Sequence, residues 1–165
     1  MKKNTRNLAL SAIIAAVYAV ITMYLTYPMS YQASQFRVAE ALTILPFFST
    51  AAIPGLFVGC LISNLLSPVG PLDIIFGSLA SLIAAFMTYL IGRSNLKFKK
   101  YLAPLPPVVV NAIIVGWLLN YTLKWPIAIT MLQVGFGQIL ACYGLGLPLA
   151  LFIERNQQLK TIFSR

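Results

Sequence analysis

Long apolar runs, separated by short polar segments, make up almost the whole chain. Set against the charged, proline and turn residues, the runs cover residues 8–27, 38–51, 52–67, 72–92, 102–120 and 126–153. A helix that crosses a bilayer needs about 20 apolar residues, so six crossings would use about 120 and leave about 45 for every loop and tail. The pattern predicts an all-α polytopic membrane protein, a six-transmembrane-helix bundle in a single domain over residues 1–165.

The first run could be mistaken for a signal peptide. Lys2, Lys3 and Arg6 precede it, and it contains small residues. A run of about 20 residues is too long for the apolar part of an ordinary signal peptide, and five further hydrophobic segments follow. We therefore interpret residues 8–27 as the first helix.

The stretch of residues 38–67 could form one long crossing or two short ones, because Pro46 and the Ile-Pro-Gly step at residues 53–55 interrupt it. Short cytoplasmic loops of membrane proteins collect Lys and Arg. Two crossings place ten of the 12 Lys and Arg residues on the cytoplasmic side, whereas one crossing would move the basic loop 93–100 outside. This favours a multi-pass protein of the cell membrane with both termini in the cytoplasm.

Composition agrees with a protein of the lipid bilayer. The chain of 165 residues is 59% hydrophobic and 9% charged, whereas soluble domains are about 45–50% apolar and about 25% charged. The net charge of +9 is explained mainly by orientation in the membrane, so nucleic acid is not an expected partner.

The inventory of reactive side chains argues against an enzyme. Glu40, Asp73 and Glu154 are the three acidic residues, and histidine is absent. Paired-carboxylate catalysis, histidine triads and metal sites therefore lack their parts, and we expect no cofactor or metal. Cys60 and Cys142 lie alone in apolar runs, as packing residues do. The sequence has no phosphate-binding motif of the P-loop type, so any ATP hydrolysis would need another subunit.

Four charged residues fall on the predicted outer side, where the orientation rule does not explain them. They are Arg37, Glu40, Asp73 and Lys124. Arg37 and Glu40 could form a local ion pair, and Asp73 could cap the helix that it begins. Carboxylates in or near a membrane nevertheless tend to face a cavity or a partner. The arrangement indicates a binding site open to the outside.

Other polar and aromatic side chains are predicted near the same level. Tryptophan and tyrosine at helix ends often belong to the interfacial belt, and this reading suits Tyr27 and Trp125. Trp117 lies further inside its helix, and glutamines in an apolar helix need a partner. The predicted substrate-binding residues are Arg37, Glu40, Asn64, Asp73, Asn111, Trp117, Tyr121, Gln133 and Gln138.

Small residues recur at spacings of three and four in three helices, which allows close helix packing in membranes. In the first helix they are Ala12, Ala15, Ala16 and Ala19, and they favour either docking of a partner subunit or packing within the bundle. In the third and fourth helices they are Gly55, Gly59 and Ser63, and Gly77, Ser81 and Ala85. We expect these two sets to pack the third and fourth helices against each other.

Three segments carry a resemblance to a known family. Residues 35–43, 52–60 and 73–80 read QFRVAEALT, AIPGLFVGC and DIIFGSLA. Together they resemble the QueT family, substrate-binding S components of energy-coupling factor (ECF) transporters associated with the uptake of queuosine precursors. The resemblance extends over essentially the whole chain and is looser in the last two helices.

The resemblance implies a six-helix S component that binds its solute at the outer face. Such a subunit works with a transmembrane T component and two ABC-type ATPase subunits. The alanine stripe is similar to the motif by which S components dock on the T component, carried here by Ala12 and Ala16 or by Ala15 and Ala19.

The implied solute, a 7-deazaguanine base, fits the polar residues. A guanine edge has two adjacent donors that suit a carboxylate and a carbonyl that suits an amide or Arg, while its ring can stack on aromatic side chains. We expect Glu40 or Asp73 to bind the edge, the other acid or Asn111 to bind the substituent, Gln133 or Asn64 to meet the carbonyl, and Trp117 or Tyr121 to stack.

Other functions stay open at this stage. The same residues would suit an S component for another vitamin or base. A stand-alone secondary transporter is less favoured, because the acids lie toward helix ends and the two halves show no obvious repeat. The loop of residues 28–36 is a candidate lid from its position alone.

Overall fold

The computed structural model describes residues 3–25 and 37–163, and this part of the chain contains helices and no strand. Three short segments, η1, η3 and η4, are π-helical turns within longer helices, and η2 is a 3-10 helix. The elements are α1 (Lys3–Val20), η1 (Ile21–Leu25), η2 (Val38–Phe47), α3 (Ala52–Asn64), η3 (Asp73–Gly77), α4 (Ser78–Arg93), α5 (Lys99–Leu102), α6 (Leu105–Leu123), α7 (Ile127–Ile139), η4 (Leu140–Gly146), α8 (Leu147–Arg155) and α9 (Gln157–Phe163).

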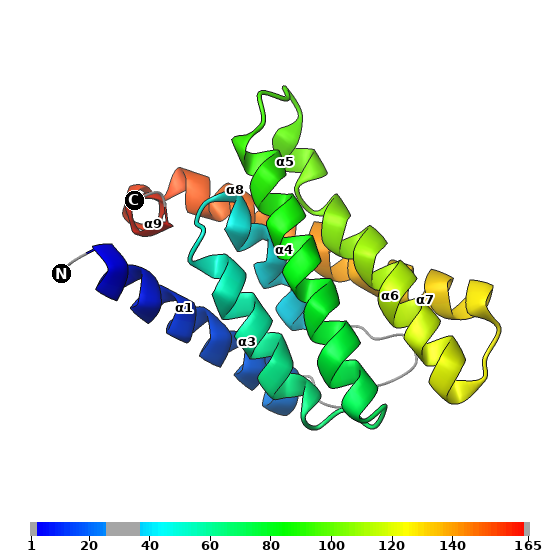
Figure 1. The fold of residues 1–165 in the computed structure, drawn as a ribbon. Coiled ribbons are helices and arrows are strands. Elements are labelled where there is room, and N and C mark those ends of the chain that lie inside the picture. The colour runs from blue at the N-terminus through cyan, green and yellow to red at the C-terminus, as the bar shows by residue number, and fades with distance from the viewer. Residues whose placement is uncertain (1–2, 26–36, 164–165) are drawn as a thin grey trace.

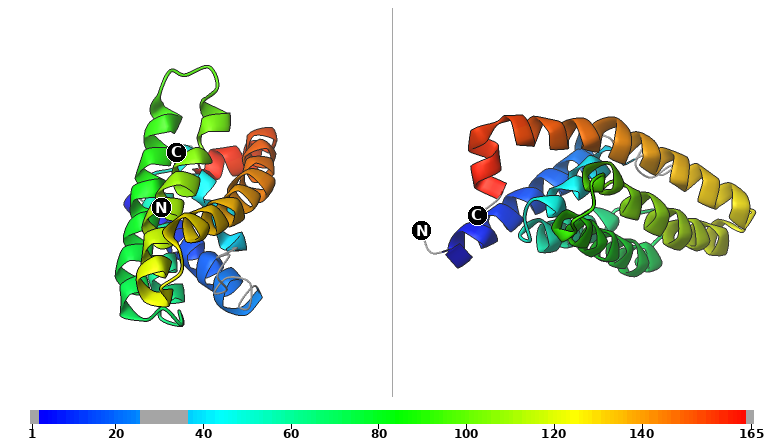
Figure 2. Two further views of the ribbon diagram at one scale, coloured as in Figure 1. Left: turned by 90° about the vertical axis from the view of Figure 1, so that its right-hand side faces the viewer. Right: turned by 90° about the horizontal axis from the view of Figure 1, so that it is seen from above.

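Four helical stretches of the described residues are long and apolar enough to cross a membrane. They are Asn4–Tyr24, Asp73–Arg93, Lys99–Leu123 and Ile127–Arg155. The last one joins α7, η4 and α8 into one long helix along one side of the molecule (Figure 2). These stretches are those of a multi-pass membrane protein.

Two shorter apolar helices, η2 and α3, lie between the first and second of these stretches. They have 10 and 13 residues, so each is about 20 Å long, which is less than the hydrocarbon core of about 30 Å. The side chain of Arg37, just before η2, bonds Asn64 at the end of α3, and the chain turns at residues 48–51. The two helices therefore run in opposite directions.

The helices are arranged around η2. Neighbours in space follow the order α1, α3, α4, α6, α7, and η2 contacts α1, α3, α4, α8 and η4. Figure 1 shows α4 in front, with α1 and α3 side by side on one flank and α6 and α7 on the other. A buried apolar cluster that includes Tyr18, Leu45, Leu56, Ala85 and Ile153 joins α1, η2, α3, α4 and α8.

The connections lie at two ends of the bundle. The start of α1, α9 and the connection between α4 and α5 lie toward one end, while the connections between α3 and η3 and between α6 and α7 lie toward the other (Figure 1). An ion pair between Lys100 and Glu154 links α5 with α8 at the first end. The charge on Glu154 is thereby matched far from the other two acids.

The expected count of six helices is not confirmed, because the described residues contain a further helix, α9. The helical path breaks at Asn156, which has an extended backbone. Its side-chain oxygen accepts hydrogen bonds from the backbone N–H groups of Gln158 and Leu159, at 3.0 and 3.3 Å. Such a cap starts a new helix, and α9 turns sharply away from α8 (Figure 2, right).

The glycines of α3 face α1, which corrects the expectation that they pack against α4. A Cβ on Gly55 would lie 2.7 Å from the backbone oxygen of Ser11, and one on Gly59 would lie 2.9 Å from that of Ala15. The backbones of α1 and α3 approach so closely because small residues meet on both helices. Contact between α3 and α4 instead includes a hydrogen bond from Ser81 to Cys60, at 3.2 Å.

The alanine stripe of α1 divides between two faces. Ala15 and Ala19 are 6% and 7% exposed and pack inside the bundle. Ala12 and Ala16 are exposed. Packing within the bundle therefore accounts for the first pair, and docking of a partner stays a prediction for the second.

Replacement of Gly59 by alanine should destabilise the protein. The added Cβ would press on the backbone of α1, and overpacking of this kind costs about 1–3 kcal/mol. Gly144→Ala is the matched control, because a Cβ there meets nothing within 4 Å and alanine favours a helix by about 0.5–1 kcal/mol over glycine. Thermal unfolding in detergent should show a lower midpoint for Gly59→Ala and an unchanged or higher one for Gly144→Ala. Equal midpoints would contradict the close α1–α3 contact.

Candidate functional site

A small cavity lies where η2, η3, α4, α6 and α7 meet. Its volume is about 10 Å³, which is room for about one water molecule. Five of its eight lining residues have polar side chains. The lining residues are Arg37, Glu40, Gly77, Ser81, Asn111, Val115, Val134 and Gln138.

The Arg37 guanidinium joins three elements on one side of the cavity. It donates to Asn64 Oδ1 at 2.9 Å and forms an ion pair with Asp73 Oδ2 at 3.1 Å. Asn64 Nδ2 in turn donates to the backbone oxygen of Asp73 at 2.9 Å. All three side chains are buried. We call these three residues the Arg37 clamp, since they tie the start of η2 to the end of α3 and the start of η3.

The clamp depends on the glycine one turn after Asp73. A Cβ on Gly77 would lie 2.6 Å from Asp73 Oδ1 and 2.7 Å from Asn64 Nδ2. The carboxylate of Asp73 therefore lies in space that only a glycine leaves open. Its Oδ1 atom is buried and has no hydrogen-bond donor among the residues that the structure describes.

Glu40 is the second buried carboxylate and is 1% exposed. Its Oε1 atom accepts a hydrogen bond of 2.6 Å from the Tyr18 hydroxyl. Its Oε2 atom lies 3.5 Å from Asn111 Nδ2, which is longer than the usual 2.7–3.2 Å of an N–H···O bond. One oxygen of Glu40 is therefore firmly held, whereas the other is only weakly bonded.

Six of the nine predicted binding residues come together here. Arg37 and Glu40 come from η2 and the residue before it, and the others come from four different helical elements. The six are Arg37, Glu40, Asn64, Asp73, Asn111 and Gln138, and four of them line the cavity directly. The local ion pair between Arg37 and Glu40 is not what the structure shows, because Arg37 forms its ion pair with Asp73. Asp73 does not serve as a helix cap either, since no side-chain cap is found at the described start of η3.

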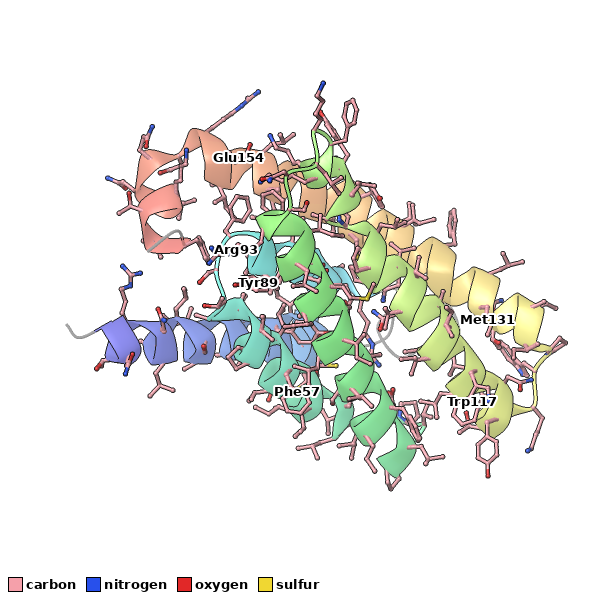
Figure 3. All side chains as sticks on the ribbon, turned by 45° about the horizontal axis from the view of Figure 1, so that its top comes forward. Phe57, Tyr89, Arg93, Trp117, Met131 and Glu154 are labelled. Carbon is pink, nitrogen blue, oxygen red and sulfur yellow. The ribbon has the colours of Figure 1, made fainter. Side chains whose placement is uncertain are left out.

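The other three predicted residues lie away from the cavity lining. Trp117 and Tyr121 are 42% and 55% exposed, and their rings stack on the surface of α6 at a centroid distance of 5.7 Å. Figure 3 shows Trp117 at the edge of the bundle. Gln133 is half-buried in α7, and its Oε1 atom finds no donor within the described ranges.

Sequence reasoning missed Tyr18 and Ser81. A buried tyrosine usually finds a partner for its hydroxyl, so Tyr18 in an otherwise apolar helix was a usable signal. Ser81 was assigned to packing, yet it lines the cavity and donates to Cys60. The candidate lid, residues 28–36, and Tyr27 lie outside the described residues.

Comparisons with known proteins agree with the resemblance seen in the sequence. The model of the QueT transporter family matches residues 8–155. The Queuosine precursor transporter QueT of Lactococcus lactis subsp. cremoris (strain MG1363) is 39% identical over 83 residues. This match covers 50% of the chain and 48% of that relative, so the chain matches about half of the relative's length. No solved structure matches.

The family match is far longer than the match to this one relative. It begins in α1 and ends with the last residue of α8, so it includes every element that contributes to the cavity. The protein therefore belongs to the QueT transporter family.

Proposed function

We propose that the protein is the substrate-binding membrane subunit, or S component, of an ECF-type importer. In this proposal it binds a queuosine precursor, a 7-deazaguanine-type base, in the cavity between η2, η3, α4, α6 and α7. Residues 1–165 form one membrane domain that crosses the bilayer six times, with both termini in the cytoplasm. The name of the bacterial relative, a queuosine precursor transporter, supports the choice of solute.

The observation that carries the proposal is the buried polar cluster itself. Arg37, Asp73 and Glu40 are all under 5% exposed within an apolar bundle. Charged groups inside a membrane protein are costly, and they mark substrate pathways and binding sites. A packing role alone would not require them, because buried ion pairs stabilise little relative to apolar residues of similar volume.

The cavity lining fits a guanine-type base. Asn111 and Gln138 provide amides that both donate and accept hydrogen bonds, as a guanine edge requires. Val115 and Val134 provide apolar walls for the ring faces. In this proposal the valine walls take the place of the aromatic stacking that we expected from Trp117 and Tyr121.

A bicyclic base is much larger than one water molecule, so it does not fit the cavity as it stands. The surrounding helices must move apart to admit it. η3 and α4 form one continuous helix, whereas η2, α6 and α7 reach the cavity from other parts of the chain. The spacing between these helices can therefore change without a break in any one of them.

Transport itself is assigned to partner subunits. The chain contains no P-loop motif, which agrees with two separate ABC-type ATPases. The exposed face of α1 with Ala12 and Ala16 is the candidate surface for the T component, because its small residues allow a second helix to come close.

Binding of 7-aminomethyl-7-deazaguanine to the purified protein tests the proposal. Glu40→Gln and Asp73→Asn should each weaken binding by about 10–100-fold, because each removes a charge from a buried hydrogen-bonded site. Glu154→Gln is the control, since Glu154 pairs with Lys100 at the other end of the bundle. Isothermal titration calorimetry measures the affinities. The proposal fails if neither site variant changes the affinity, or if the wild-type protein binds no 7-deazaguanine.

Gly77→Ala should weaken binding of the same base by about tenfold or more. The added Cβ displaces Asp73 Oδ1 and Asn64 Nδ2, and it thereby disturbs the Arg37 clamp beside the cavity. Gly135→Ala in α7 is the matched control, because its Cβ would make only an ordinary contact with Ala112, at 3.5 Å. The same titration compares the two variants, and a thermal melt confirms that both are folded. Equal affinities would show that the clamp has no part in binding.

A further inference from the structure

The charges around the cavity do not balance. Arg37 contributes one positive charge, while Asp73 and Glu40 are two acids. Arg37 forms its ion pair with Asp73 and bonds Asn64 on the same side. Glu40 is thus a second acid beside a single base, and the positive charge of Arg37 already offsets the negative charge of Asp73.

Glu40 is also the acid that faces the cavity. It belongs to the lining, whereas Asp73 lies behind Gly77. No other cation that the structure describes lines this cavity: Lys124 lies over the Tyr121 ring at 5.0 Å, and Lys100 pairs with Glu154 at the far end. The lining that a ligand would meet therefore carries Glu40 and one cation, Arg37, which already forms an ion pair with Asp73.

The hydrogen bonds of Glu40 come from neutral groups. Tyr18 donates to Oε1 at 2.6 Å, and Asn111 approaches Oε2 at 3.5 Å. Neither donor carries a charge that could match a carboxylate. The weakly bonded Oε2 keeps acceptor capacity, because a carboxylate oxygen can accept two hydrogen bonds, and Glu40 belongs to the cavity lining.

We propose that Glu40 Oε2 is a subsite for a protonated amine on the ligand. This inference rests on the proposed function and narrows its substrate class to 7-deazaguanines that carry a cationic aminomethyl group. An ammonium has three N–H donors. Glu40 accepts one, and the side-chain carbonyl of Gln138 on the same lining can accept another, while Asn111 remains for the guanine edge.

The competing arrangement has Glu40 accepting the neutral N–H groups of the guanine edge. The two arrangements differ in what the charge of Glu40 contributes. A hydrogen bond to the Glu40 carboxylate is charge-assisted in both arrangements, but only the cationic amine adds the Coulomb attraction of a full positive charge. In the competing arrangement, every 7-deazaguanine would depend on Glu40 equally.

Two bases of nearly equal shape separate these arrangements. The probes are 7-aminomethyl-7-deazaguanine, which is cationic, and 7-hydroxymethyl-7-deazaguanine, which is neutral. The wild-type protein should bind the amine about 10–100-fold more tightly than the alcohol. Glu40→Gln should abolish this preference, because it should weaken binding of the amine by about tenfold more than it weakens binding of the alcohol.

Three results would overturn the inference. Equal binding of both bases by the wild-type protein contradicts it while leaving the proposed function intact, and this comparison needs no variant to fold. Equal weakening of both bases by Glu40→Gln assigns Glu40 to the guanine edge instead. Binding of neither base by the wild-type protein removes the proposed function, and the amine subsite with it.

Discussion

The ion pair between Arg37 and Asp73 is the constraint on which the rest of the structure depends. It joins η2 to η3 inside an apolar bundle, where leaving either charge alone would cost several kcal/mol. Asn64 adds the end of α3 to the same group. Because Arg37 directly precedes η2, the pair fixes where that helix begins and therefore which of its residues faces the cavity. Glu40 reaches the cavity for this reason.

Much of this site could be predicted from the distribution of charge. Arg37, Glu40, Asp73 and Lys124 were grouped because the orientation rule left them unexplained. The structure brings the first three close together, whereas Lys124 lies over the Tyr121 ring. Whether Trp117 lies on the buried or the exposed face of its helix could not be predicted in the same way. Apart from Asn111 and its last turn, the helix is apolar on all faces, so the sequence pattern gives little indication of which face is buried. The structure places that ring on the surface.

The pairing of helices was predicted less well than their existence. The apolar runs located the longer helices but missed two short ones, α5 in the basic loop and α9, whose start depends on a single side chain, Asn156. Stripes of small residues indicate that a helix packs closely, but they do not indicate which helix is its partner. Gly55 and Gly59 could equally have met α4, and the contact with α1 becomes evident only in three dimensions. Tyr18 was missed for a related reason, since its partner Glu40 lies 22 positions away in sequence.

The 3-10 form of η2 sets the distance that this short helix can span. Ten residues extend about 20 Å at the 3-10 rise of about 2.0 Å per residue, but only about 15 Å in an α-helix. At one end the helix is tied to Asp73 through Arg37, and at the other Phe47 lies against Gly92 at the end of α4. The tighter winding lets a ten-residue segment contact both ends of the continuous helix that η3 and α4 form. A change to α-helical winding would shorten η2, and one of these two contacts would be lost.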